Sequence, residues 1–257
     1  MKFGSEERKL ENKIFTYSQY LKTKFGKKVF RVGLSLGKIC PHRLKNNGCV
    51  FCNPETFTGE YQSQNLSIKA QLENAIPRIK RACGDVALLA YFQDETSTAG
   101  SLDFLKVKFK QALSHPEIIG LVISTRPDFV NLEILELLKS FQVPLTIEIG
   151  LQSIHDKSLK LLNRGHTFEQ AEKTIRQCGE NGLDVGVHLI MGIPGESFAD
   201  MKKTVQWISA NKFIKQVKFH NLVVYKNTKL AEMNLPILTI DEYIEALANL
   251  LPHLRKD

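Results

Sequence analysis

The stretch KICPHRLKNNGCVFCNPETF, residues 38–57, contains three of the five cysteines in the chain. Eight residues separate Cys40 from Cys49, and two separate Cys49 from Cys52. Three thiolates that share one loop converge easily on a metal, so the spacing indicates a metal centre. A cubane iron–sulfur cluster usually takes four cysteines, and three would leave one iron open. A closed zinc site would instead recruit His42 as its fourth ligand, and spacing alone leaves the two interpretations level.

The composition is typical of a globular protein, and we expect its cysteines to be reduced. The chain has 257 residues and 43% hydrophobic residues, and no apolar run approaches the roughly 20 residues that cross a bilayer. The charged N-terminus lacks the apolar core of a signal peptide. We therefore expect a cytoplasmic protein, in which clustered cysteines bind metal or catalyse rather than form disulfides.

The net charge of +8 allows two interpretations. It is compatible with an ordinary solvated basic surface and with a polyanionic partner such as RNA, whose phosphates basic groups attract without regard to sequence. Composition alone favours the first interpretation, because no RNA-binding motif is visible.

Strand-like and helix-like segments alternate along the chain. Apolar, strand-like runs lie at residues 29–36, 86–93, 120–128, 144–153, 184–196 and 217–225. Helical spacing follows them at residues 68–83, 101–115, 131–141, 168–182, 197–211 and 240–254. This alternation predicts a parallel sheet covered by helices.

Polar residues gather where the strands end, which favours a barrel because its carboxyl rim carries the chemistry. Six units rather than eight predict an α/β fold of the partial (β/α)6 TIM-type barrel kind, whose open side would admit a large substrate. We expect a single domain over residues 1–257. It would consist of an N-terminal helical extension (1–28), the barrel (29–225) and a C-terminal helix (226–257).

The cysteine stretch follows the first predicted strand and ends in Cys-x-aromatic-Cys, CVFC. With the later segments IEIGLQSIHDKSLKLLNRGH, VGVHLIMGIPGE and VKFHNLVVYKNTKLAEM, it resembles the radical S-adenosylmethionine (SAM) superfamily. Within that superfamily it looks like the YhcC/YtqA type and, more distantly, the elongator catalytic subunit. The resemblance runs from about Tyr20 to Met233 and implies the partial barrel, a [4Fe–4S] cluster and SAM as cofactors.

The resemblance assigns candidate cofactor residues. Three cysteines would hold the cluster: Cys40, Cys49 and Cys52. The expected SAM contacts come from the loop and from the ends of strands two, four, five and six: Phe51, Gln93, Thr96, Glu148, Gln152, Arg164, Met191, Gly192 and Val223, with Leu222 as the alternative to Val223. Arg164 is the candidate for the SAM carboxylate, because a guanidinium binds a carboxylate with two parallel hydrogen bonds.

The remaining polar rim residues are candidates for the substrate side: Arg126, Asp128, His188, His220 and Tyr225. For His188 and His220, a hydrogen-bonded histidine of the core is an equally good interpretation. Cys83 and Cys178 fall in predicted helices, and we expect them to be packing residues.

The implied function is reductive cleavage of SAM to a 5′-deoxyadenosyl radical, directed at the side chain of the tRNA wobble uridine. The YtqA-type proteins are associated with conversion of a carboxymethylaminomethyl group to aminomethyl on that nucleoside. The expected partners are tRNA and a reductant of the flavodoxin or ferredoxin type. The alternatives are a radical SAM enzyme for a small molecule or a protein, and a non-catalytic, zinc-stabilised RNA-binding protein.

Overall fold

The computed structural model describes residues 14–62 and 65–255. Residues 1–13 of the expected N-terminal extension (1–28), including the charged stretch at its start, lie outside the described residues. The described part of that extension forms one helix, α2 (Tyr17–Phe25), which a capping box at Thr16 begins and Gly26 ends.

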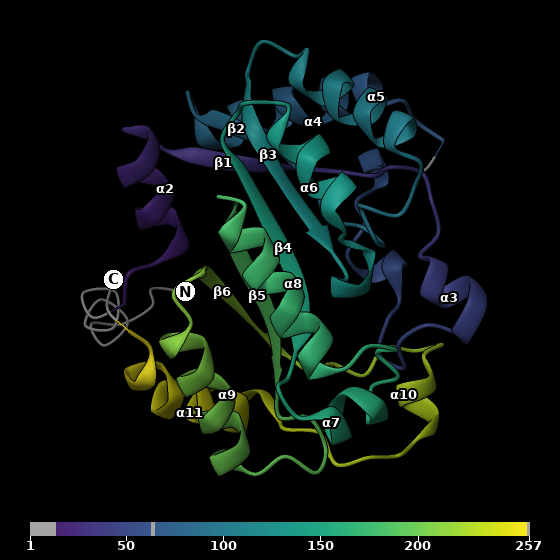
Figure 1. Cartoon of the computed structure of the whole chain (residues 1–257), viewed down its shortest axis with the longest axis vertical. Coiled ribbons are helices and arrows are strands. Elements are labelled where there is room, and N and C mark those ends of the chain that lie inside the picture. Colours follow the sequence, from purple (N-terminus) through teal and green to yellow (C-terminus); the bar gives the residue numbers. More distant parts are fainter. Residues whose placement is uncertain (1–13, 63–64, 256–257) are drawn as a thin grey trace.

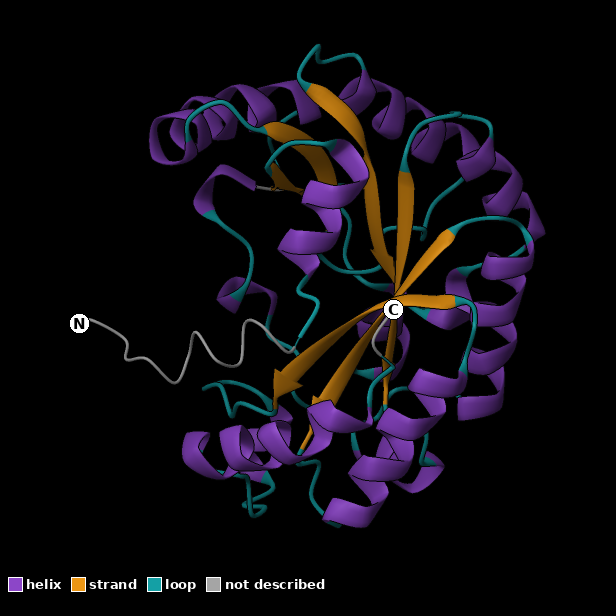
Figure 2. Ribbon diagram, turned by 90° about the vertical axis from the view of Figure 1, so that its left-hand side faces the viewer, coloured by secondary structure: helices purple, strands orange, loops and turns teal. Residues whose placement is uncertain are grey.

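Six parallel strands form one sheet in sequence order. The strands are β1 (Val29–Leu34), β2 (Ala87–Phe92), β3 (Ile118–Thr125), β4 (Leu145–Gln152), β5 (Asp184–Met191) and β6 (Ile214–Asn221). Each pairs only with its neighbours in that order, so β1 and β6 are the two edges of a curled, open sheet. The predicted partial (β/α)6 barrel is confirmed (Figure 2).

An outer arc of helices covers the convex face of the sheet (Figures 1 and 2). It comprises α4 (Ile68–Cys83), α5 (Leu102–Leu113), α6 (Leu132–Lys139), α8 (Phe168–Glu180), α9 (Phe198–Ala210) and α11 (Ile240–Leu250). A Ser, Thr or Asn at the N-cap of each accepts a hydrogen bond from the first turn, which satisfies backbone donors that the helix itself leaves free.

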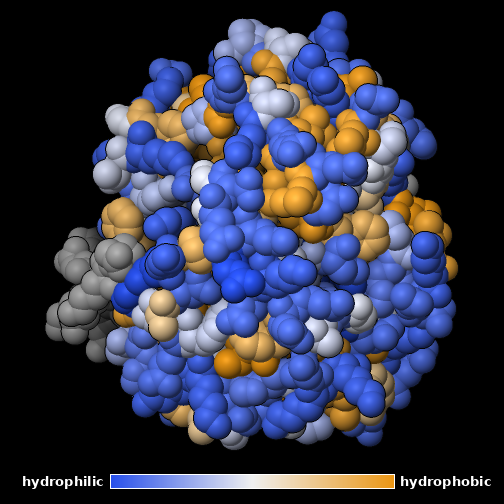
Figure 3. All heavy atoms as spheres, viewed as in Figure 1, coloured by the Kyte–Doolittle hydropathy of each residue, from blue (hydrophilic) through white to orange (hydrophobic). Residues whose placement is uncertain are grey.

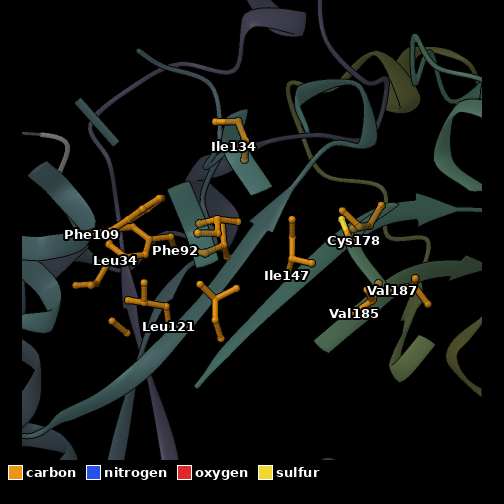
Figure 4. Close-up of a cluster of buried hydrophobic side chains, with 14 of the residues drawn as sticks. Leu34, Phe92, Phe109, Leu121, Ile134, Ile147, Cys178, Val185 and Val187 are labelled. Carbon is orange, nitrogen blue, oxygen red and sulfur yellow. The ribbon is translucent and has the colours of Figure 1, made fainter. Parts of the chain in front are cut away.

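The main core lies between the strands and this arc (Figure 4). Alternate strand residues point outward into it, including Leu34, Phe92, Ile147 and Val187, all essentially inaccessible to solvent. Cys178 of α8 is buried in the same core, and Cys83 packs against it, as expected for packing residues. Burial of these apolar side chains provides the main driving force for the fold.

The opposite residues of each strand point into the barrel, because successive side chains alternate across a strand. Near the amino-terminal end of the barrel, Leu21 of α2 packs on Leu89 and Val122 from the inner face. Tyr20 and Lys24 of α2 also contact Asp184, the first residue of β5. Helix α2 thus covers the amino-terminal end of the barrel. It does not cover the carboxyl ends of the strands.

Three expectations about individual elements are wrong. The last strand spans residues 214–221 instead of 217–225, because Val223, Val224 and Tyr225 turn outward into an exposed loop. The final helix ends at Leu250 and tightens into a 3-10 turn, where Pro252 removes a backbone donor. The cysteine stretch contains a short helix, α3 (Pro41–Asn46). Two further short helices, α7 (Asp156–Leu161) and α10 (Lys229–Glu232), have no counterpart in the prediction.

The exterior shown in Figure 3 is mostly hydrophilic, with scattered hydrophobic patches. No helix in the described part of the chain is long and apolar enough to cross a membrane.

Candidate active site

The cysteine loop (residues 38–57) leaves the carboxyl end of β1 and lies over the rim of the barrel. Its backbone is hydrogen-bonded to two segments that follow later strands. Val50 donates to the Leu162 carbonyl at the end of α7, after β4, and Leu230 of α10, after β6, donates to the Val50 carbonyl. The loop is therefore fixed by elements that are far apart in the sequence. All three of its cysteines are free and partly accessible.

Helix α3 is held by a buried carboxylate from the β2 side. Both Glu95 oxygens accept hydrogen bonds from Arg43, at 2.9 and 2.8 Å, and one of them also accepts from the Cys40 backbone N–H at 2.8 Å. Arg43 in turn reaches the Cys52 sulfur at 3.5 Å, and Thr96 lies 3.0 Å from the Cys40 sulfur. One carboxylate thus sets the position of two cysteines.

The NRGH segment, residues 163–166, clamps the other side of the loop. The Asn163 side chain donates to the carbonyls of Asn46 and Gly48, and the Asn163 carbonyl lies 2.6 Å from His42 Nε2. Gly165 has a φ of +68°, and a Cβ there would lie 2.5 Å from the His42 ring. His42, the fourth ligand that a zinc site needs, is buried, and its Nε2 is bonded to this turn.

Two arginines face Cys49. Arg164 Nη1 lies 3.1 Å from the Cys49 sulfur and Arg126 Nη1 lies 3.9 Å from it. Burial would raise the pKa of Cys49, but Arg164, a hydrogen bond with His42 and Arg126 outweigh it and lower the pKa to about 6. At Cys52, burial and the neighbouring Cys49 prevail over Arg43 and raise the pKa to about 11. Of these two thiols, Cys49 more readily becomes the thiolate that metal binding requires.

Arg164 is placed by a glycine on β4. Its second Nη donates to the Gly150 carbonyl at 2.8 Å, and a Cβ at Gly150 would lie 2.9 Å from it. Arg126 donates to the Arg164 carbonyl and forms an ion pair with Asp128 at 3.0 Å. Arg126 and Asp128, expected on the substrate side, therefore lie beside the cysteines, together with Arg164.

A second group of predicted residues lies deeper in the barrel. Glu148 is at the middle of β4, four residues or about 13 Å of strand below Gln152. One of its oxygens accepts from Arg31 at 2.9 Å, and the other contacts Tyr91 at 2.6 Å, Ser124 at 3.1 Å and His188 at 2.8 Å. His188 Nδ1 lies 3.1 Å from His220 Nε2. We call Tyr91, Glu148, His188 and His220 the interior chain.

The carboxylate of the interior chain is ionised. Burial alone would raise the pKa of Glu148, but the hydrogen bond and charge of His188, the charge of Arg31 and the Tyr91 hydroxyl lower it to about 2. The predicted contact of Glu148 with SAM stays a prediction, and the structure gives this residue extensive protein partners as well.

The other predicted residues lie around the rim. Phe51 packs on a small apolar cluster that includes Ile190, Ile193 and Leu222, whereas Val223 is 43% exposed. Gln152, with a φ of +69°, ends β4 beside Arg164, and Gln93 reaches the Phe57 carbonyl at 3.4 Å.

At the end of β5, Met191 is buried in the main core and the Gly192 N–H points to the Met201 sulfur. Tyr225 lies in the exposed loop after β6, away from the interior chain.

Several residues of the site were missed by sequence reasoning: Arg31, Arg43, Tyr91, Glu95, Ser124 and Asn163. Asn163 stands within the NRGH segment that was already singled out, and Glu95 stands between the predicted SAM contacts Gln93 and Thr96. Arg31 carries the clearest missed signal, since a charge inside an apolar strand is costly unless it is paired.

The donor set fits a cluster better than a single ion. Among residues 14–62 and 65–255, no three His, Cys, Asp or Glu side chains are grouped closely enough to hold one metal ion. A cubane cluster offers a separate iron to each thiolate, so its ligands need not converge on one point. The arginines around the sulfurs suit the negative charge of a thiolate-bound cluster.

Comparison with known proteins identifies the family. Residues 34–208 match the model of the Radical SAM superfamily. The chain belongs to this superfamily. It is 37% identical over 248 residues to the protein MJ0486 of Methanocaldococcus jannaschii, covering 93% of this chain and 76% of that protein. It is 36% identical over 218 residues to the protein YhcC of Escherichia coli, covering 82% of this chain and 69% of that protein.

Two further similarities involve longer proteins. A tRNA uridine(34) acetyltransferase of Methanocaldococcus infernus is 35% identical over 129 residues, which is 49% of this chain and 24% of that protein. The solved structure of Elp3 from Methanocaldococcus infernus has the same fold, with a TM-score of 0.65 at 23% identity over 86% of this chain. The chain spans about half of that solved chain, 53% of its length.

Membership of the radical SAM superfamily makes the chain a radical SAM enzyme, with a [4Fe–4S] cluster and SAM as its cofactors. It also excludes the non-catalytic zinc protein considered from the sequence. Cys40, Cys49 and Cys52 are the residues of this chain that would hold the cluster.

Proposed function

We propose that this radical SAM enzyme acts on the wobble uridine of tRNA and converts a carboxymethylaminomethyl side chain to aminomethyl. The observation that carries the substrate class is the similarity to a tRNA uridine(34) acetyltransferase over about half of the chain. The net charge of +8 supports a polyanionic partner. The open side of the six-stranded barrel supports a substrate as large as a base turned out of its stack.

In this proposal the rim residues bind and orient the cofactors. When bound, the reduced cluster and SAM would supply a 5′-deoxyadenosyl radical able to take one hydrogen atom from the methylene carbon of the carboxymethyl group. Return of the remaining electron to the oxidised cluster would leave an imine, and water would release the two carbons as glyoxylate and leave the aminomethyl group. Arg164 would bind the SAM carboxylate; Phe51, Gln93, Thr96, Gln152, Met191, Gly192 and Leu222 or Val223 would surround the rest of SAM. Arg126, Asp128 and Tyr225 would face the substrate from the rim, and His188 and His220 from the interior.

We further propose a small flavodoxin or ferredoxin as the reductant. A groove of about 920 Å³ flanks the cysteine loop and is lined by Ile39, Leu44 and Lys45, among other residues. Ile39 and Leu44 are exposed apolar side chains next to a cysteine ligand. Such a surface suits a partner that must approach the cluster closely.

The test begins with reconstitution of the purified chain under anaerobic conditions with iron and sulfide. After reduction, the enzyme is incubated with SAM and with tRNA that carries the carboxymethylaminomethyl nucleoside. We expect 5′-deoxyadenosine, together with loss of that nucleoside and gain of the aminomethyl form by mass spectrometry. Cys52→Ser should abolish both, and Cys83→Ser, at the end of α4, should abolish neither.

The outcomes separate the parts of the proposal. SAM cleavage without any change in the tRNA would overturn the substrate and favour a small molecule or a protein instead. Absence of SAM cleavage from a protein that contains its cluster would contradict the assignment of the SAM contacts.

A further inference from the structure

The interior chain extends from the middle of the barrel to its rim. Glu148 pairs with Gly186 across the sheet, His188 lies one layer higher, and His220 lies opposite Ile190, one residue before the end of β6. His220 therefore lies at the level of the β5 end, where the predicted SAM contacts begin, while Glu148 stays buried below.

The hydrogen bonds of the interior chain define one tautomer for each histidine. An ionised carboxylate only accepts hydrogen bonds, so His188 Nε2 carries the proton that lies between it and Glu148. In the neutral imidazole, His188 Nδ1 then has a free lone pair and accepts from His220 Nε2. The same reasoning leaves His220 Nδ1 unprotonated in the neutral ring. No protein group in the described part of the chain is hydrogen-bonded to that nitrogen.

The surroundings of His220 favour its neutral form. Burial, His188 and Lys218 together lower its pKa to about 3, against a weaker opposing effect of Glu148. The charged groups around the interior chain include Arg31 on β1 and Lys218 on β6, both inside the open half-barrel. A neutral ring among cations is a hydrogen-bond acceptor and not a donor at Nδ1.

We propose that the interior chain forms a substrate subsite in which His220 Nδ1 accepts a hydrogen bond from an N–H or O–H group of the substrate. Glu148 and His188 act as positioning residues, since they fix the ring and its tautomer. The ligand class is a protic group, such as the imide N–H of a pyrimidine or a side-chain amine. This inference rests on the proposed function only for the identity of the substrate that carries the group.

A first experiment needs neither cofactor nor substrate. Nitrogen-15 spectra of the histidine-labelled full chain at neutral pH should show His220 as a neutral ring with its proton on Nε2. His188→Gln and His220→Gln assign the signals of the two rings. A proton on Nδ1 of His220, or a doubly protonated His220 at pH 7, would overturn the proposal.

A second experiment uses substitutions that separate the two ring nitrogens. Asparagine places an amide oxygen close to the Nδ1 position, whereas glutamine places one close to Nε2. His220→Asn should retain most of the substrate affinity, while His220→Gln and His220→Phe should raise KM at least about tenfold, the effect of one lost buried hydrogen bond. His115→Phe, in the turn between α5 and β3, is the matched control.

Measurements without substrate separate loss of the proposed hydrogen bond from damage to the cluster site. All four variants should bind the same amount of iron and sulfide per chain as wild type, which shows an intact cluster site. The His115→Phe control should also form 5′-deoxyadenosine in the absence of substrate at the wild-type rate. An equal KM for His220→Asn and His220→Phe would contradict the acceptor role. A wild-type enzyme that ignores tRNA would instead overturn the proposed function, and the tautomer measurement would still decide the present inference.

Discussion

Glu95 connects β2 to the cysteine loop through three hydrogen bonds, two to Arg43 and one to the Cys40 N–H. We predict that Glu95→Gln reduces the iron and sulfide bound per chain after anaerobic reconstitution and speeds cluster loss to a chelator several-fold. The physical reason is that an amide presents only one acceptor oxygen, so part of the three-bond set to Arg43 and Cys40 is lost, and each hydrogen bond to a charged group contributes about 1.5–3 kcal/mol. Glu133→Gln, on the exposed first turn of α6, should behave as wild type.

Glu148 makes a second prediction at the scale of a residue. Its folded pKa of about 2 lies below the ordinary value of 4.5, so its ionised form stabilises the fold above pH 4.5. That contribution, on the order of 3 kcal/mol, is lost as the pH falls from 4.5 towards 2. Urea unfolding should therefore show a stability gap between wild type and Glu148→Gln that is full at pH 6 and shrinks below pH 4.5.

Tyr91→Phe is the matched control for this pH dependence, since it removes a donor but keeps the carboxylate. It should lower stability by about 1 kcal/mol while retaining the acid-induced loss. A gap between wild type and Glu148→Gln that stayed constant down to pH 3 would contradict the role of the charge.

At the scale of elements, the contact between α3 and the turn after α7 requires a glycine at position 165, where a Cβ would have no room. Gly165→Ala would place a Cβ 2.5 Å from the His42 ring, and we predict that it displaces the cysteine loop and halves cluster content or worse. Gly182→Ala is the matched control, because Gly182 has a similar positive φ of +78° but no atom within 4 Å of an added Cβ. An equal loss of cluster in the two variants would show that backbone strain, and not the contact with His42, causes the loss.

Helix α2 makes the second prediction at this scale. Leu21 is buried against inner-face residues of β2 and β3, so Leu21→Ala should lower the free energy of unfolding by about 2–4 kcal/mol. Lys22→Ala, on the exposed side of the same helix, should cost less than about 0.5 kcal/mol. Denaturant titration of both variants checks this, and similar losses would mean that α2 does not cover the barrel end.

The elements that the sequence predicted well are those with long apolar runs and clear caps. The alternation of residues 86–93 with 101–115, for example, recurs in the structure as β2 and α5. Short helices such as α3 and α7 were missed because six residues carry too little periodicity. The interior chain was missed as a unit, since its bonds join β2, β4, β5 and β6 and depend on register, which local patterns do not determine.

For the whole molecule, the charge of the chain gives the last prediction. If tRNA binds over the open carboxyl rim, rim lysines such as Lys45 on α3 and Lys226 after β6 contact phosphates. Each contact releases counterions, so the logarithm of the binding constant should fall linearly with the logarithm of the salt concentration. Lys45→Glu with Lys226→Glu should reduce that slope by about 2.

The control reverses two exposed lysines on the outer arc, Lys110 on α5 and Lys173 on α8. It changes the net charge by the same amount and should leave the slope within experimental error of wild type. If both double variants lowered the slope equally, binding would follow total charge and the rim would have no special part in it. Fluorescence titration of labelled tRNA between low and moderate salt distinguishes the two cases.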